Sequence, residues 1–216
     1  MSPALLSAVQ AEVSQAPLAS TAATLMQSRQ TILPKRLIAP GPDAAQLALI
    51  LQAAATAPDH GQLLPWRLVR VPQAERGRLA EVFGAALLER DADATPEQVA
   101  QAREKAHRSP LLLLAIVDGL KGDAEIDLSE RMASAGCALQ NMLLMATALG
   151  YGSALTSGKA LKSAGLRTLF GLRAGEHALC FVSVGTVQSR KPPRVRPVPD
   201  DFFTTLGGAE TALTQV

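Results

Sequence analysis

The sequence predicts a mixed α and β fold with a single sheet. Three observations lead to this prediction: strand-like apolar runs are few, helical segments separate them, and 216 residues usually form one domain. Apolar residues make up 48% of the chain, which is enough to bury a large core.

Several helices carry clear start signals. Asp43 and Gln46 have the spacing of a capping box, and so do Thr95 and Gln98, with Pro96 at the first helical position. Proline or glycine follows several of the helical segments and ends them. The expected helices are 21–27, 44–55, 75–89, 96–107, 128–149 and 160–170.

Short apolar runs predict the strands. Leu111–Val117 is the longest clean run and has the length of a buried strand. Leu68–Val71 and Leu179–Val184 are the other expected strands. The tail from Gln188 is basic and rich in proline, and it turns apolar again at Val198–Phe203.

Helix 128–149 is the longest expected element. Its apolar or small residues alternate at spacings of four and three, as in a packing seam, and further apolar residues lie on its other faces. We therefore expect a central helix with a face suited to a subunit contact. The seam consists of Leu128, Met132, Ala135, Leu139, Met142, Ala146 and Leu149.

Composition argues against several classes of function. The net charge of +2 and the seven aromatic residues do not favour nucleic-acid binding. No apolar run reaches the ~20 residues of a membrane span, and the first twenty residues do not resemble a secretory signal. Cys137 and Cys180 lie in apolar sequence without a CxxC motif, so we expect two buried, reduced thiols in a cytoplasmic protein.

Two further kinds of site find no support in the sequence. The three histidines have no metal-ligand spacing, so no metal site is expected. No GxGxxG or Walker sequence is present, so an NAD-binding Rossmann domain is not indicated.

Residues 57–67, Ala-Pro-Asp-His-Gly-Gln-Leu-Leu-Pro-Trp-Arg, are the most informative segment. They join a helix to a strand, and prolines flank His60 and the single Trp66. Loops fixed by the scaffold on both sides often build sites. Alternatively, this is a surface loop whose tryptophan packs beneath it and fills core volume. The segment closely resembles the APDH…PW motif of short, single-domain FMN-dependent NAD(P)H nitroreductases.

Two other segments resemble the same family in the same order. Arg29-Gln30-Thr31 is similar to the Arg-Arg-Ser signature that holds the FMN phosphate, with Gln30 in place of the second arginine. Leu155-Thr156-Ser157-Gly158 matches the loop whose backbone N–H groups face the N5–O4 edge of the flavin. Considered alone, the first segment is an ordinary solvated one and the second an ordinary start of a helix.

Compared with the family, this sequence lacks some positively charged residues expected near FMN and has two arginines in its tail. Thr56 and Thr156 stand where some relatives have an arginine near FMN. Arg194 and Arg196 are two apart in an extended, proline-rich segment, so they face the same side. The family often uses a late basic residue on the phosphate, although a solubilising linker is the plainer interpretation.

The resemblance spans residues 25–203 and implies an α+β nitroreductase-like fold, a mostly antiparallel sheet wrapped by helices in an intertwined homodimer. Two FMN sites are implied at the interface, with His60 reaching the flavin of the other subunit and able to lend it a proton. Residues 1–20 are then an N-terminal extension, loosely helical or mobile, 21–203 the FMN-binding domain and 204–216 a tail. Val198–Phe203 is expected to add a strand to the partner's sheet.

The implied reaction is ping-pong. NAD(P)H passes a hydride to flavin N5, and a nitroaromatic, a quinone or a similar small aromatic acceptor then takes it. Two alternatives stay open. One is another flavin reaction on this scaffold, such as dehydrogenation of an activated C–C bond or flavin fragmentation. The other is a non-catalytic FMN-binding or flavin-free protein, which the neutral residues Gln30, Thr56 and Thr156 favour.

Overall fold

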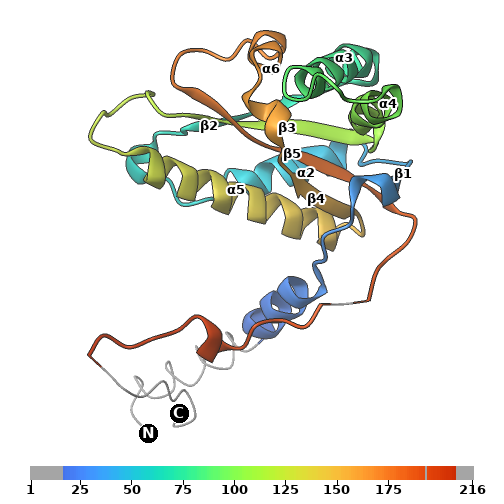
Figure 1. The fold of residues 1–216 in the computed structure, drawn as a ribbon. Coiled ribbons are helices and arrows are strands. Elements are labelled where there is room, and N and C mark those ends of the chain that lie inside the picture. The colour runs from blue at the N-terminus through green and yellow to red at the C-terminus, as the bar shows by residue number, and fades with distance from the viewer. Residues whose placement is uncertain (1–16, 193, 208–216) are drawn as a thin grey trace, which may run out of the picture.

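The computed structural model describes residues 17–192 and 194–207. In this part of the chain, a five-stranded sheet lies between two layers of helices, which confirms the α+β class (Figure 1). The strands are β1 (Leu37–Ile38), β2 (Trp66–Arg70), β3 (Leu111–Asp118), β4 (Gly152–Thr156) and β5 (Glu176–Val187). The helices are α2 (Ala44–Ala54), α3 (Arg76–Leu88), α4 (Pro96–Glu104), α5 (Leu128–Ala148) and α6 (Ala164–Leu169), and residues 17–28 are helical too.

The strand order is β1-β5-β3-β2, with β4 also paired to β5. All ladders between these strands are antiparallel, as expected. Helices cover both faces of β3, and every residue from 111 to 117 is buried. A strand that is buried on both faces needs no polar alternation, which explains the continuous apolar run.

Two hydrophobic cores lie on the two faces of the sheet. Leu113 and Ala115 of β3 pack into the core under α2 and α5, together with Leu139 of α5. Leu112 and Leu114 point to the other face and pack against α3 and α6. The sheet therefore fixes α5 on one side and the α3–α6 layer on the other.

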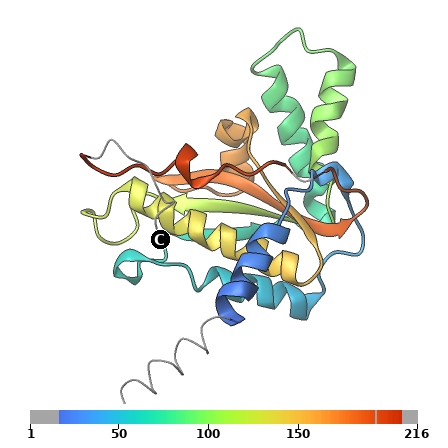
Figure 2. The same ribbon diagram turned by 90° about the horizontal axis from the view of Figure 1, so that it is seen from below.

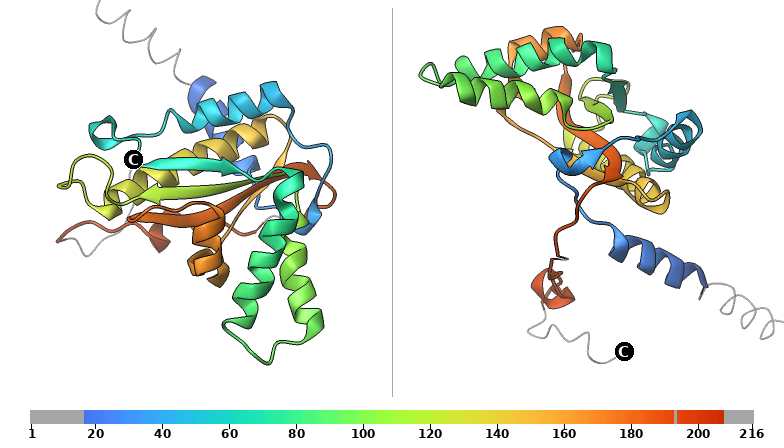
Figure 3. Two further views of the ribbon diagram at one scale, coloured as in Figure 1. Left: turned by 90° about the horizontal axis from the view of Figure 1, so that it is seen from above. Right: turned by 90° about the vertical axis from the view of Figure 1, so that its right-hand side faces the viewer.

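Both expected capping boxes are formed. The Gln46 backbone N–H donates to Asp43 Oδ1 (2.8 Å) and the Asp43 N–H donates to Gln46 Oε1 (3.0 Å), which starts α2. Thr95 and Gln98 make the same reciprocal pair at the start of α4. Figures 2 and 3 show α3 and α4 as an antiparallel hairpin that projects from the sheet.

Three expectations about secondary structure were wrong. Leu155-Thr156 belongs to β4 and is not loop, because it pairs with Phe181 and Val182 of the distant β5. The expected helix 160–170 is a 3₁₀ turn, Lys159–Lys162, followed by α6, because Ser163 caps a new helix that begins at Ala164, its hydroxyl accepting from the Leu166 backbone N–H. In the segment that follows β5, which we call the arm, Pro199–Asp201 is a 3₁₀ turn where we expected part of a strand.

Helix α5 is central, as expected, but its buried face includes polar residues. Arg131 and Ser134 are buried beside the apolar seam, whereas Leu128 at its first position is 39% exposed. Cys180 is buried as expected, but Cys137 is exposed on the outer face of α5. The expectation of two buried thiols was therefore wrong for Cys137.

Helix 17–28 and the arm that follows β5 leave the body of the protein together (Figures 1 and 3). A hydrogen bond of 2.9 Å from Arg196 Nη2 to the Arg29 carbonyl joins them. The expectations for residues 1–16, for Pro193 and for 208–216 lie outside the described residues.

The two-sided burial of β3 makes a stability test direct. Leu114 is 0% exposed and Leu120, in the following loop, is 71% exposed. Leu114→Ala should lower the free energy of unfolding by about 3–4 kcal/mol, and Leu120→Ala by about 0.5 kcal/mol or less. Urea denaturation followed by circular dichroism measures both, and equal losses would contradict the placement of β3.

Candidate functional site

The loop between α2 and β2 is held in an unusual backbone conformation. Gly61, Gln62 and Leu64 have φ values of 64°, 53° and 46°. Such values cost energy in the two residues other than glycine, and conformations of this kind concentrate at functional sites. The Asp59 carboxylate supports the loop by accepting the Leu64 backbone N–H (2.5 Å).

A second loop, residues 118–126, supports the first. Its anchor is Arg131, only 1% exposed, whose guanidinium donates to the carbonyls of Ile126 (2.8 Å) and Lys121 (2.6 Å), among others. Lys121 in turn donates from Nζ to the Leu64 carbonyl (2.7 Å). A buried cation that is held by backbone carbonyls thus fixes the support of the His60 loop.

His60 is exposed at the tip of its loop and is oriented by α5. Its Nδ1 lies 2.7 Å from Glu130 Oε2, in the first turn of the helix. Since a carboxylate only accepts, Nδ1 is the donor, and Nε2 is left to face a ligand. The structure therefore gives His60 one fixed side and one available side.

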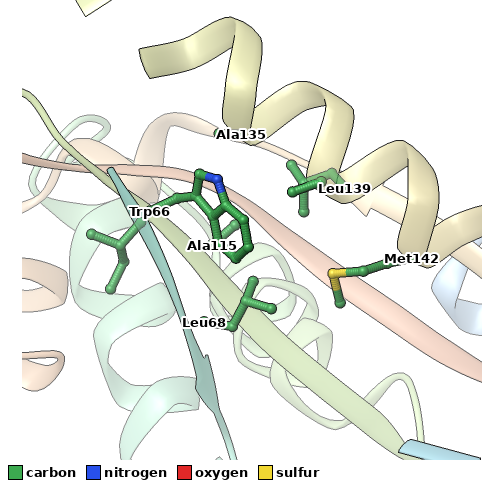
Figure 4. A pocket seen from close by; sticks show the side chains of 8 residues that line it. Trp66, Leu68, Ala115, Ala135, Leu139 and Met142 are labelled. Atoms are coloured by element: carbon green, nitrogen blue, oxygen red, sulfur yellow. The ribbon is translucent and has the colours of Figure 1, made fainter. Parts of the chain in front are cut away.

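Trp66 is a packing residue, as expected. Its indole N–H donates to Ser134 Oγ (3.2 Å). Figure 4 shows the indole opposite Leu139 and Met142, across a gap of about 10 Å³ between the sheet and α5. A gap of this size holds at most one water, so it is no cofactor cavity.

Thr56 contacts a neighbouring helix. Its hydroxyl donates to the Ala53 carbonyl (2.8 Å) and accepts from Asn141 Nδ2 of α5 (3.0 Å). The hydroxyl therefore contributes to the α2–α5 contact.

Arg29 and Thr31 form the other candidate cluster, next to β4. Thr31 makes a β-bridge with Ser153, and Arg29 Nη1 donates to Thr31 Oγ1 (3.5 Å). Partial burial and the nearby positive charge of Arg196 lower the pKa of Arg29. Among the described residues, neither arginine has a carboxylate partner within 4 Å. Two neighbouring cations without a counter-ion favour an anionic ligand.

The other residues that were expected to bind FMN differ in their exposure. Gln30 is half-buried, and Arg194 is exposed on the arm without a hydrogen bond to any described residue. Ser157 and Gly158, beyond the end of β4, are exposed, and their backbone N–H groups have no acceptor in residues 17–192 and 194–207. The Ser153 hydroxyl is buried without a partner there, a feature that sequence alone does not indicate.

The two clusters lie at opposite ends of α5. Glu130, which holds His60, is in the first turn of this 21-residue helix, whereas Ser153, which bridges to Thr31, follows its last turn. A helix of that length spans roughly 30 Å. The chain thus joins Arg29, Thr31 and Arg196 but does not bring His60 to them.

The sequence model of a protein family, described as the Nitroreductase family, matches residues 28–186. The chain belongs to the nitroreductase family. It is 32% identical over 184 residues to a Haemophilus influenzae protein named "Putative NAD(P)H nitroreductase", covering 85% of this chain and 98% of that one. It is 30% identical over 170 residues to YdjA of Escherichia coli K12, which has the same description, covering 78% of this chain and 91% of YdjA.

Solved structures show the same nitroreductase fold. A nitroreductase-like family protein from Bacillus cereus matches with a TM-score of 0.71 at 17% identity, covering 86% of this chain and 96% of that one. The FMN-dependent nitroreductase NfnB from Mycobacterium smegmatis, solved in complex with NADPH, matches with a TM-score of 0.68 at 16% identity, covering 87% and 99%. In the described part of this family member, no helix is long and apolar enough to cross a membrane.

Burial in the core of this nitroreductase raises the pKa of the Cys180 thiol to about 11, so the thiol is protonated at neutral pH and we expect it to be unreactive. At pH 8, a chromogenic disulfide reagent should leave Cys180 unmodified in the folded Cys137→Ser variant and modify it in urea. Rapid modification of Cys180 in the folded variant would contradict this assignment.

Proposed function

We propose that this nitroreductase is an FMN-dependent oxidoreductase that takes a hydride from NAD(P)H and delivers it to a nitroaromatic, a quinone or a similar flat acceptor. The observation that carries the proposal is the Arg29–Arg196 pair beside Thr31, two cations with no carboxylate partner among the described residues. The names of the relatives support the nicotinamide donor, and the NfnB structure supports FMN.

The residues present fit the phosphate of FMN. Arg29 and Arg196 supply positive charge, and Thr31 adds a hydroxyl that already faces Arg29. A phosphate dianion between the guanidinium groups would offset both the partial burial and the nearby Arg196 charge that lower the pKa of Arg29.

The chain beyond β4 fits the flavin edge. FMN, when bound, supplies the hydride chemistry. Ser157 and Gly158 present backbone N–H groups from a turn that the β4–β5 ladder anchors, so they can donate to the ring without moving. An added Cβ at Gly158 would meet no atom within 4 Å, which leaves room for a ligand against the backbone.

We infer that two copies of the chain complete the site. The His60 loop and the Arg29 cluster lie at opposite ends of α5, so a ligand held by both must lie between chains. The outer face of α5, where Gly136, Cys137 and Gln140 are exposed, and the arm around Val195 and Phe202 are surfaces that a second copy would cover. In this arrangement His60 Nε2 faces the ring of the other subunit and can hold a proton near the acceptor.

One observation favours a second candidate, a protein that binds FMN without turnover. Gln30, Thr56 and Thr156 are neutral, and Thr56 is engaged with Asn141 rather than available to a ligand. Purified protein separates the candidates. The oxidoreductase should be yellow, bleach with NADPH under anaerobic conditions and recover colour with a nitroaromatic. Colour without bleaching would identify the second candidate, and no colour after reconstitution with FMN would contradict both.

Charge removal tests the phosphate cluster. Arg29→Ala should weaken FMN binding about tenfold or more, because it deletes a charge-assisted contact to a dianion. Lys105→Ala, an exposed cation elsewhere on the surface, should leave the affinity within about twofold of the unaltered protein. Fluorescence quenching of added FMN measures both, and equal affinities would remove Arg29 from the site.

A site that is shared between two chains requires a dimer in solution. Light scattering should give the mass of two chains, and FMN should bind at two molecules per dimer. Gln140→Arg, which adds bulk and charge to the exposed face of α5, should shift the mass toward one chain and weaken FMN binding. Arg78→Glu on α3 is the control and should change neither. A single-chain mass with full FMN affinity would contradict the shared site.

A further inference from the structure

A hollow of about 360 Å³ opens where β2 begins and β3 ends. Residues of several segments line it, among them Arg67 of β2, Asp118 of β3, Lys121 of the supporting loop and Arg173 before β5. Its volume is within the range of small-molecule sites. None of the residues that we assign to FMN lines it.

A buried carboxylate organises the hollow. The Glu176 side chain is 0% exposed and accepts from Arg67 Nε (2.7 Å) and Nη2 (3.0 Å), and from Arg173 Nη2 (2.9 Å) and its backbone N–H (2.8 Å). The Arg67 hydrogen bonds, and then those of Arg173, hold the pKa of Glu176 far below its ordinary value against the effect of burial. Glu176 is therefore a fixed anion that orients two arginines.

Each arginine keeps unused donors at the hollow. Arg67 uses Nε and Nη2 on Glu176, so Nη1 remains, and its side chain is 38% exposed. Arg173 uses Nη2 on Glu176 and Asp118, so Nε and Nη1 remain, and its side chain is 69% exposed. With Lys121, three cations face the two carboxylates, which leaves one net positive charge.

The lining also has an apolar part. Leu64, Pro65 and Ile116 contribute to it, and Leu64 is 50% exposed. A buried ion-pair network adds little net stability compared with apolar packing, so its position at a concave hollow points to recognition. A ligand with one negative charge and an apolar body matches both parts of the lining.

We propose that this hollow binds a small monocarboxylate with an apolar body, its carboxylate on Arg67 and Arg173 and its body against the exposed side chain of Leu64. The planar guanidinium groups suit a carboxylate, which can take two parallel N–H donors. Leu64 and Pro65 belong to the His60 loop, so an occupant would contact this loop at its C-terminal end, whereas His60 lies nearer its N-terminal end. The proposal does not depend on FMN binding.

Benzoate is the probe, and backbone signals beside the hollow report where it binds. The indole N–H of Trp66 faces Ser134 of α5, so the backbone N–H groups of Trp66 and Arg67 are the reporters in a ¹H–¹⁵N spectrum of the full-length protein. Benzoate should shift these signals saturably with a Kd of about millimolar, as expected for a ligand of this size. Benzamide, the neutral analogue of the same shape, should bind at least about fivefold more weakly.

Matched variants test the arginines. Arg173→Gln should weaken benzoate binding about fivefold to tenfold, because one charged donor is lost in a partly exposed site. Arg78→Gln is the control, since Arg78 is 68% exposed and also pairs with a glutamate three residues away. Lys121→Gln, which also removes one positive charge, should weaken binding too and serves if Arg173→Gln fails to fold. Unchanged spectra with benzoate, equal binding of benzamide, or equal effects of Arg173→Gln and Arg78→Gln would overturn the proposal. Much tighter binding of phenyl phosphate would overturn the carboxylate assignment.

Discussion

The length of α5 is the constraint on which the rest of the structure depends. Sheet residues of β3 and β5 hold one face of this helix, and the two candidate clusters are attached to its two ends. Because a packed helix cannot shorten, the His60 loop and the Arg29 cluster cannot meet within one chain. A site that uses both must be shared, and the arm and helix 17–28, which leave the body of the protein, are available to a second copy (Figure 1).

Local signals predicted the helices well, since capping boxes depend on residues only three apart. Asp43–Gln46 and Thr95–Gln98 start helices where the sequence indicates. β4 escaped prediction because Gly152–Thr156 has weak strand character and depends on its ladder with β5, about thirty positions away. The same reason explains the missed two-residue strand β1, which pairs with the end of β5.

In the candidate site, too, features that depend on local sequence were predictable and features that depend on distant residues were not. The loop around His60 was predictable from its own residues, whereas the expected loop at Leu155-Thr156 is part of β4. The groups that orient His60 and Arg67 were not predictable, because they come from distant positions. Glu130 is 70 residues from His60, and Glu176 is 109 residues from Arg67. The packing of α5 against the loop determines the first pair and the sheet register determines the second, and no local pattern specifies either.

Mixed dimers test the shared site most directly. If Arg29 and His60 of one site come from different chains, then unfolding and refolding Arg29→Ala together with His60→Ala produces dimers with one intact and one doubly altered site. The account expects each variant alone to bind FMN weakly and the mixture to regain tight binding at about one FMN per mixed dimer. A mixture that binds no better than the average of the two variants would contradict it, since every site would then lie within a single chain.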